Sequence, residues 1–176
     1  NKAIVHILNE NTVWNTLIIS PPGFGKTTLL KDIIKKISNG IPEFNFKGVT
    51  CGVVDERGEL SATYKGISQN DLGIRTDVID NIPKALGMKM LIRSMSPKVI
   101  IADEIGKKED VDAIEYAVTS GVKGIFTAHG SDLEQIEHNP ILNQLIINGY
   151  IEKVLAMDKQ RNVHLLYEKQ SKRKVS

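Results

Sequence analysis

The chain has 176 residues, of which 41% are hydrophobic and 25% charged, and its formal net charge is +2. This length predicts one domain that buries a core without disulfide support, and the near-neutral charge favours no class of partner. No apolar stretch approaches the roughly 20 residues that a membrane-spanning helix needs, and no signal peptide opens the chain. The single cysteine, Cys51, lies in an apolar run, which favours a small buried side chain in a protein of the reducing cytoplasm.

A strand, a glycine-containing loop and a helix follow one another near the beginning of the chain. Residues 1–11 have apolar side chains at helical spacing and predict a short helix, and residues 16–19 predict the first core strand. The loop of residues 20–28 reads S-P-P-G-F-G-K-T-T, and the apolar spacing after it predicts a helix over residues 26–38 that Gly40 ends. The order of these elements is that of a phosphate-binding loop.

The loop residues have the chemistry that binding a phosphate chain requires. Gly23 and Gly25 permit unusual backbone dihedrals and close approach to a ligand, Lys26 can reach β- and γ-phosphates, and the Thr27 hydroxyl can ligate Mg²⁺. The usual pattern has glycine where this chain has Ser20, and a turn that binds nothing is the alternative interpretation. The candidate nucleotide-binding residues are Ser20, Pro21, Pro22, Gly23, Phe24, Gly25, Lys26, Thr27 and Thr28.

The middle of the chain alternates apolar runs with a long polar segment. Residues 48–54 predict a buried strand that ends at Asp55, Glu56 and Arg57. Residues 58–84 show little periodicity and predict an irregular segment that is functional or merely solvated. Anion contact is the functional interpretation, since arginines occur near a predicted phosphate site. A helix that begins at Pro83 and ends before Pro97 follows, with its methionines filling the core.

Two adjacent acids follow the apolar run of residues 99–102. We expect this strand to neighbour the strand before the glycine loop, so that Asp103 helps to hold Mg²⁺, directly or through water. Glu104 would then position the attacking water. A pair of surface acids at a strand end is the alternative.

The last third of the chain predicts two helices, a strand and a hairpin. Residues 107–120 predict a helix, residues 122–128 a buried strand, and a helix begins at Pro140. His129 at the tip of the strand is a candidate sensor of the γ-phosphate or a simply hydrogen-bonded histidine. Residues 151–157 and 162–167 predict a hairpin, which closes an ATPase domain over residues 1–168. The basic tail, residues 169–176, is expected to be flexible and solvated, with attraction to anionic lipid or nucleic acid as the alternative.

The chain resembles the stage III sporulation protein AA family. The resemblance covers nearly the whole sequence and rests on T-L-I-I-S-P-P-G-F-G-K-T-T, G-V-V-D-E-R, Y-K-G-I-S-Q-N-D-L-G-I-R-T-D-V, M-S-P-K-V-I-I-A-D-E-I-G and T-A-H-G. More distantly, the chain is similar to the type II and type IV secretion ATPases. The resemblance implies an α/β fold, a RecA-like P-loop NTPase domain whose mainly parallel sheet is flanked by helices.

The resemblance also implies roles, partners and a cellular setting. It marks Glu56 as an acid near the attacking water and His129 as the histidine of the histidine box of secretion ATPases, and Arg57, Arg75 and Arg93 are candidates for phosphate or intersubunit contacts. It implies ATP and Mg²⁺ as cofactors and a homo-hexamer in the full-length protein. Membrane-embedded channel proteins would be partners, at the mother-cell side of a spore-forming bacterium's forespore membrane. The chain begins with Asn1, so we expect an upstream domain to be missing.

Two rival functions use the same scaffold. A nucleic-acid motor is disfavoured because aromatic residues make up only 5% of the chain and no basic stripe is evident outside the tail, so no nucleic-acid partner is expected. A nucleotide-binding scaffold without turnover is the other rival. Adenine is favoured over guanine because no N-K-x-D element follows the glycine loop.

Overall fold

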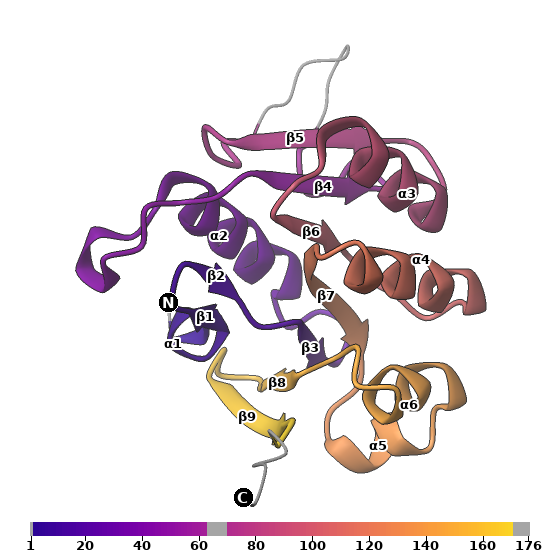
Figure 1. Ribbon diagram of the computed structural model, residues 1–176. Helices are drawn as coiled ribbons and strands as arrows, with labels where there is room; N and C mark the ends of the chain where they lie inside the picture. Colours follow the sequence, from indigo (N-terminus) through magenta and orange to yellow (C-terminus); the bar gives the residue numbers. More distant parts are fainter. Residues whose placement is uncertain (1, 63–69, 171–176) are drawn as a thin grey trace, which may run out of the picture.

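The protein folds around one seven-stranded sheet that is mostly parallel (Figure 1). The computed structural model describes residues 2–62 and 70–170. The strands are ordered β5 (Thr76–Asp80), β4 (Cys51–Asp55), β6 (Val99–Ala102), β7 (Lys123–His129), β3 (Thr16–Ser20), β8 (Lys153–Met157) and β9 (Val163–Glu168). Neighbours pair in parallel except β8 and β9, which form the predicted antiparallel hairpin. The α/β fold class with a C-terminal hairpin is therefore confirmed.

Helices cover both faces of the sheet and divide the core in two (Figure 1). On one face, α1 (Ala3–Ile7) and α2 (Lys26–Asn39) bury their apolar side chains against β3, β4, β6 and β7. On the other face lie α3 (Lys84–Met95), α4 (Lys108–Thr119), α5 (Leu133–Glu137) and α6 (Pro140–Ile147). A sheet buried on both faces explains why β3, β4 and β6 are apolar without alternation.

The structure adds elements that the sequence did not predict. A small hairpin of β1 (Leu8–Asn9) and β2 (Thr12–Val13) follows α1, a short 3₁₀ helix spans Pro42–Phe44, and α5 precedes α6. The irregular segment predicted over residues 58–84 is wrong in part, because β5 extends the sheet beyond β4. Lys65 and Gln69 of that segment lie outside the described residues.

The acidic tip and the glycine loop lie at one edge of the sheet, but their strands are not neighbours. The expectation that the strand of residues 99–102 lies next to the loop strand is wrong, because β7 lies between β6 and β3. All three strands run in parallel, with Ser20 opposite His129 and Ala102 opposite Phe126. The carboxyl ends of β3, β7 and β6 therefore share one edge, where open α/β sheets bind ligands.

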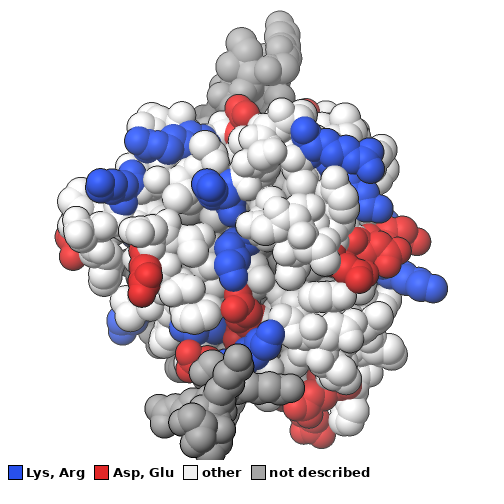
Figure 2. Space-filling model, in the orientation of Figure 1, with Lys and Arg blue, Asp and Glu red and all other residues white. Residues whose placement is uncertain are grey.

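Cys51 is fully buried, and burial raises the pKa of its thiol to about 12. No helix within residues 2–62 and 70–170 is long and apolar enough to cross a membrane. Basic and acidic side chains are interspersed on the face drawn in Figure 2. Of the predicted tail, residues 171–176 lie outside the described residues, whereas Lys169 still donates its backbone N–H to the Glu152 carbonyl over 2.7 Å.

Candidate active site

The glycine loop connects β3 to α2 as the sequence predicts. Gly23 and Gly25 have φ angles of +84° and +83°, in the left-handed region that glycine adopts without strain. Gly25 is the N-cap of α2, and its carbonyl accepts the Leu29 N–H. Ser20, at the position where the usual pattern has glycine, is fully buried and its hydroxyl donates to the Pro21 carbonyl over 3.2 Å. The loop thus turns into the amino end of a 14-residue helix, where the helix dipole favours an anion.

Lys26 is a buried cation without a hydrogen-bond partner. Its side chain belongs to the first residue of α2 and is only 7% exposed, and its ammonium makes no hydrogen bond to any described residue. Burial lowers the pKa of Lys26, and the negative charges of Asp103, Glu104 and Glu59 partly oppose that shift. Buried polar groups are normally hydrogen-bonded, so a buried ammonium without an acceptor at the end of this loop is an exception that calls for an explanation.

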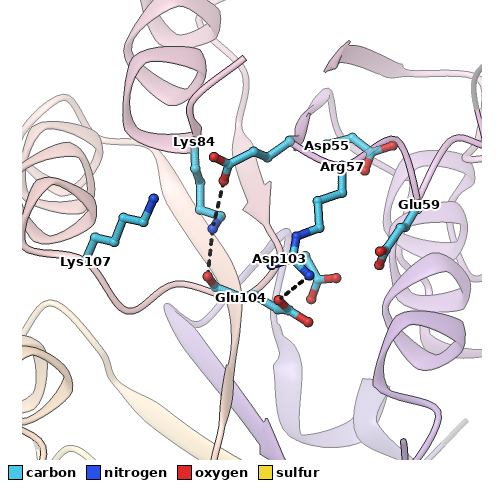
Figure 3. Close-up of a pocket in the computed structure, with 8 residues that line it drawn as sticks. Asp55, Arg57, Glu59, Lys84, Asp103, Glu104 and Lys107 are labelled. Carbon is cyan, nitrogen blue, oxygen red and sulfur yellow. Dashed lines mark hydrogen bonds and ion pairs between the residues drawn. The ribbon is translucent and has the colours of Figure 1, made fainter. Parts of the chain in front are cut away.

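Glu104 follows β6 in a strained and firmly held conformation. Its φ of +54° is in the left-handed region, which costs a residue with a side chain roughly 1 to 2 kcal/mol. The backbone N–H of Glu104 donates to the Thr127 hydroxyl over 2.8 Å, and its carbonyl accepts from the Lys84 ammonium over 2.7 Å. These two hydrogen bonds fix the backbone conformation of Glu104, and its carboxylate points toward Arg57 (Figure 3).

Asp103 is held by the neighbouring strand. The Thr127 hydroxyl, which is fully buried in β7, donates a hydrogen bond to Oδ1 of Asp103. Ile105, two residues after Asp103, donates its N–H to the Thr127 carbonyl over 2.8 Å. A single threonine therefore places both acids at the end of β6.

Two cationic or titratable groups face the Glu104 carboxylate. Arg57, two residues beyond β4, places Nη1 3.4 Å from Oε2 of Glu104, and His129, the last residue of β7, places Nε2 3.7 Å from Oε1. The side chains of Arg57 and His129 are 70% and 53% exposed. Exposed ion pairs of this kind are weak, so neither contact fixes its side chain in place.

Lys84 links the ends of two strands and was not predicted. It is the first residue of α3, is 8% exposed, and its ammonium lies 3.2 Å from Oε2 of Glu56 as well as 2.7 Å from the Glu104 carbonyl (Figure 3). It therefore holds the acid after β4 and the acid after β6 in one arrangement.

A cavity of about 240 Å³ opens between these strand ends. Five acids and three bases line it (Figure 3): Asp55, Glu56, Arg57, Glu59, Lys84, Asp103, Glu104 and Lys107. Asp55 belongs to its wall, because its buried carboxylate accepts hydrogen bonds from the backbone N–H groups of Leu60 and Ser61 and from the Ser61 hydroxyl. It therefore shapes the segment that carries Glu59.

Arg75 and Arg93 are not brought to this cavity within the chain. Arg75 precedes β5 and its Nη1 donates to the Ser38 carbonyl over 2.9 Å, near the carboxyl end of α2. Arg93 lies in the last turn of α3, with its guanidinium 5.7 Å from the centre of the Tyr116 ring. Both lie at the end of the sheet opposite the glycine loop, so they remain candidates only for contacts with another subunit.

Sequence reasoning missed Lys84 and Glu59, and only Lys84 has a signal, which lies in the topology and not in any motif. β5 is parallel to β4, so the residues after Asp80 return to the loop edge, and Lys84 follows three residues after the strand exit at Asn81. A predicted strand at residues 76–80 would have pointed to Lys84.

The donor set fits a magnesium ion that is bound together with phosphates. No group of three or more His, Cys, Asp and Glu side chains within residues 2–62 and 70–170 forms a metal cage. Magnesium in phosphate sites commonly takes one or two protein oxygens and completes its shell with water and substrate. The Thr27 hydroxyl at the start of α2 and the Asp103 carboxylate are oxygens of the kind it prefers.

Comparisons with known proteins agree on family and fold. The family model for sporulation stage III, protein AA matches residues 1–174. Stage III sporulation protein AA of Bacillus subtilis (strain 168) is 42% identical over 171 residues, which are 96% of this chain and 55% of that protein.

Solved structures resemble the chain in fold. The pilus retraction motor PilT, solved with bound ADP, has a TM-score of 0.62 at 14% identity and covers 90% of this chain and 48% of its own. The ATPase DotB of Legionella pneumophila has a TM-score of 0.61 at 18% identity, and the match covers 94% of this chain and 47% of DotB. The chain spans about half the length of each of these proteins. It belongs to the sporulation stage III, protein AA family and has the RecA-like fold of the secretion ATPases.

Proposed function

We propose that this chain binds and hydrolyses ATP. The observation that carries the proposal is the buried ammonium of Lys26, which has no hydrogen-bond partner among the described residues and lies between a glycine loop and two fixed acids. Such a group is stabilised when a phosphate chain supplies the missing acceptors. The fold of PilT, which was solved with bound ADP, supports the same class of ligand.

Each polar side chain of the site has its own role in the proposed transfer of the γ-phosphate. The loop N–H groups and Lys26 neutralise the phosphate chain, and Thr27 and Asp103 would hold Mg²⁺. When bound, Mg²⁺ adds positive charge at the phosphate oxygens where negative charge develops. Glu104 orients the water that attacks the γ-phosphate in line with the leaving group.

The charged partners of Glu104 have supporting roles in this proposal. Arg57 lies 3.4 Å from Glu104 and can move to the transferred phosphoryl group, and His129 senses the occupied site from β7. Glu56, held by Lys84 at 3.2 Å, is the second acid near the water. An arginine that joins such a site raises the rate of hydrolysis by a factor of about 10³ to 10⁵, because it stabilises the transition state. Arg75 or Arg93 of another subunit would supply such a group if the full-length protein is a hexamer.

The cellular role follows the family and is a proposal of the same kind. We propose that the full-length protein is a cytoplasmic homo-hexamer at the mother-cell side of the forespore membrane. There it would power a membrane-embedded sporulation channel. The domain over residues 1–168, a tail after it and an upstream domain remain predictions.

Phosphate release against protein concentration tests the activity. Wild-type protein should hydrolyse ATP faster per molecule as its concentration rises, since a neighbouring subunit completes the site. Lys26→Ala should lose nucleotide affinity, whereas Glu104→Gln should keep binding and stop hydrolysis. Glu56→Gln separates the two acids: normal hydrolysis by Glu104→Gln together with loss in Glu56→Gln would contradict the assignment of the water-positioning acid.

A further inference from the structure

A second cavity adjoins the glycine loop on the side away from the acids. It has a volume of about 570 Å³ and lies between the start of α2 and the turn that joins β8 to β9. Its apolar lining comes from Leu29, Met157 and Val163, and its polar rim includes Thr28, Asp32 and Arg161. Volumes of this size are typical of sites for small organic ligands.

The strand order fixes how this groove relates to the acidic cavity. β7, β6 and β4 lie on one side of β3, and β8 and β9 lie on the other (Figure 1). A nucleotide whose γ-phosphate lies beside Asp103 and Glu104 has its phosphate chain along the loop. Its nucleoside end must then leave the loop on the side of β8 and β9.

Arg161 is held over the loop at the entrance to this groove. Its Nε lies 3.3 Å from the position that a Cβ on Gly25 would occupy, so the guanidinium lies directly against the residue that caps the amino end of α2. Its φ of +63° is maintained by a tightly bonded turn, in which the Arg161 N–H donates to the Asp158 carbonyl over 3.0 Å.

The Asp158 side chain completes the turn. Its carboxylate accepts the N–H groups of Gln160 and Asn162 over 3.0 and 2.9 Å, and Nε2 of His164 lies 2.8 Å from Oδ2. These bonds lower the pKa of Asp158. The turn is thus an ordered platform, which fixes the backbone from which Arg161 reaches the loop.

We propose that this groove binds the purine base and ribose of the nucleotide, and that Arg161 lies against the face of the base. The inference rests on the proposed function. A guanidinium is planar, stacks on aromatic faces and is attracted to their π electrons. The apolar side chains of Leu29, Met157 and Val163 suit the other face and the apolar edge of a base, while Thr28 and Asp32 offer polar groups to the ribose hydroxyls.

Two ligands separate contacts with the base from contacts with phosphate. Binding of ATP and of inorganic tripolyphosphate, each with Mg²⁺, is measured by calorimetry for wild type, Arg161→Met and the control Lys159→Met. Lys159 is exposed in the same turn and lines neither cavity. We expect Arg161→Met to raise the Kd for ATP about tenfold and to leave the Kd for tripolyphosphate unchanged. Lys159→Met should change neither.

The remaining outcomes distinguish failure of the base-binding proposal from failure of the proposed function. An unchanged Kd for ATP in Arg161→Met, or an equal loss for both ligands, overturns the proposal, since the guanidinium then does not contact the base. Wild-type protein that binds neither ligand contradicts the proposed function instead. Val163→Phe, which fills the groove from the start of β9, tests the site without Arg161: it should weaken ATP and spare tripolyphosphate.

Discussion

Replacing Lys26 with methionine should make the nucleotide-free protein more stable while it abolishes nucleotide binding. Methionine has a similar length and shape but no charge. Lys26 is 7% exposed and its ammonium has no hydrogen-bond acceptor among the described residues. Burial is the largest influence on its pKa and lowers it, so the charged form is disfavoured by folding.

The expected gain can be worked from these contacts. An unsatisfied buried polar group costs about 1 to 3 kcal/mol, and attraction to Asp103, Glu104 and Glu59 offsets part of this cost. We therefore expect Lys26→Met to raise the free energy of unfolding by about 1 to 2 kcal/mol. For a chain of this size that corresponds to an increase in Tm of roughly 2 to 8 °C.

The gain should shrink as the pH rises. Because the pKa of Lys26 is lowered in the folded state, the unfolded chain binds more protons between the lowered pKa and the ordinary value of 10.5. The free energy of unfolding of the wild type therefore rises with pH in this window, as the buried ammonium loses its proton. Lys26→Met lacks this contribution, so the two proteins should converge toward pH 10.5.

Thermal unfolding at several pH values, with and without Mg-ATP, measures both effects. At a ligand concentration 100 times Kd the wild type should gain about 2.7 kcal/mol, whereas Lys26→Met should gain nothing. The control is Lys31→Met, a half-buried lysine on the same helix, which should change stability by less than about 0.5 kcal/mol. A lower Tm for nucleotide-free Lys26→Met would refute the reasoning, because the three acids would then outweigh the cost of burial.

Two further substitutions test how the cavity is held together. Lys84→Met leaves the Glu104 carbonyl and the Glu56 carboxylate without their shared partner, so kcat for ATP hydrolysis should fall at least about tenfold while KM changes less than about threefold. The control Lys89→Met, on the same helix, should leave both constants unchanged. Equal kinetics for the two variants would contradict the positioning role of Lys84. Asp55→Asn replaces the carboxylate oxygen that accepts from Ser61 in the buried cavity wall, and urea unfolding should show that the free energy of unfolding falls by about 2 to 4 kcal/mol. The exposed control Asp77→Asn should lower it by less than about 0.5 kcal/mol. A small loss for Asp55→Asn would mean that the cavity wall relaxes around the amide.

Elements that are specified locally could be predicted from the sequence. The β3 to α2 unit follows from an apolar run, two glycines and helical spacing, all of which act within about 25 residues. The hairpin of β8 and β9 and the acidic end of β6 are equally local signals. The glycine loop and the two acids were therefore recognised, and the parallel sheet brings them to the same edge.

Features that depend on tertiary pairing could not be predicted. Thr76–Asp80 has acids at two of its five positions and no apolar run, so β5 exists because β4 offers it a partner. Without β5 the direction of the chain before α3 is unknown, and Lys84 carries no motif of its own. Because β5 was not predicted, the position of Arg75 could not be predicted either. Arg75 lies at the amino end of that strand, where it contacts Ser38 and not the cavity.

The way Glu104 is suspended has a mechanical consequence. Its N–H is hydrogen-bonded to the Thr127 hydroxyl of β7 and its carbonyl to the Lys84 ammonium of α3, so this one residue connects a strand of the sheet with a helix that covers it. A displacement of α3 along the sheet would move Lys84, and with it the Glu104 carbonyl that Lys84 binds. The position of the Glu104 carboxylate therefore depends on the position of α3, the helix whose last turn contains Arg93.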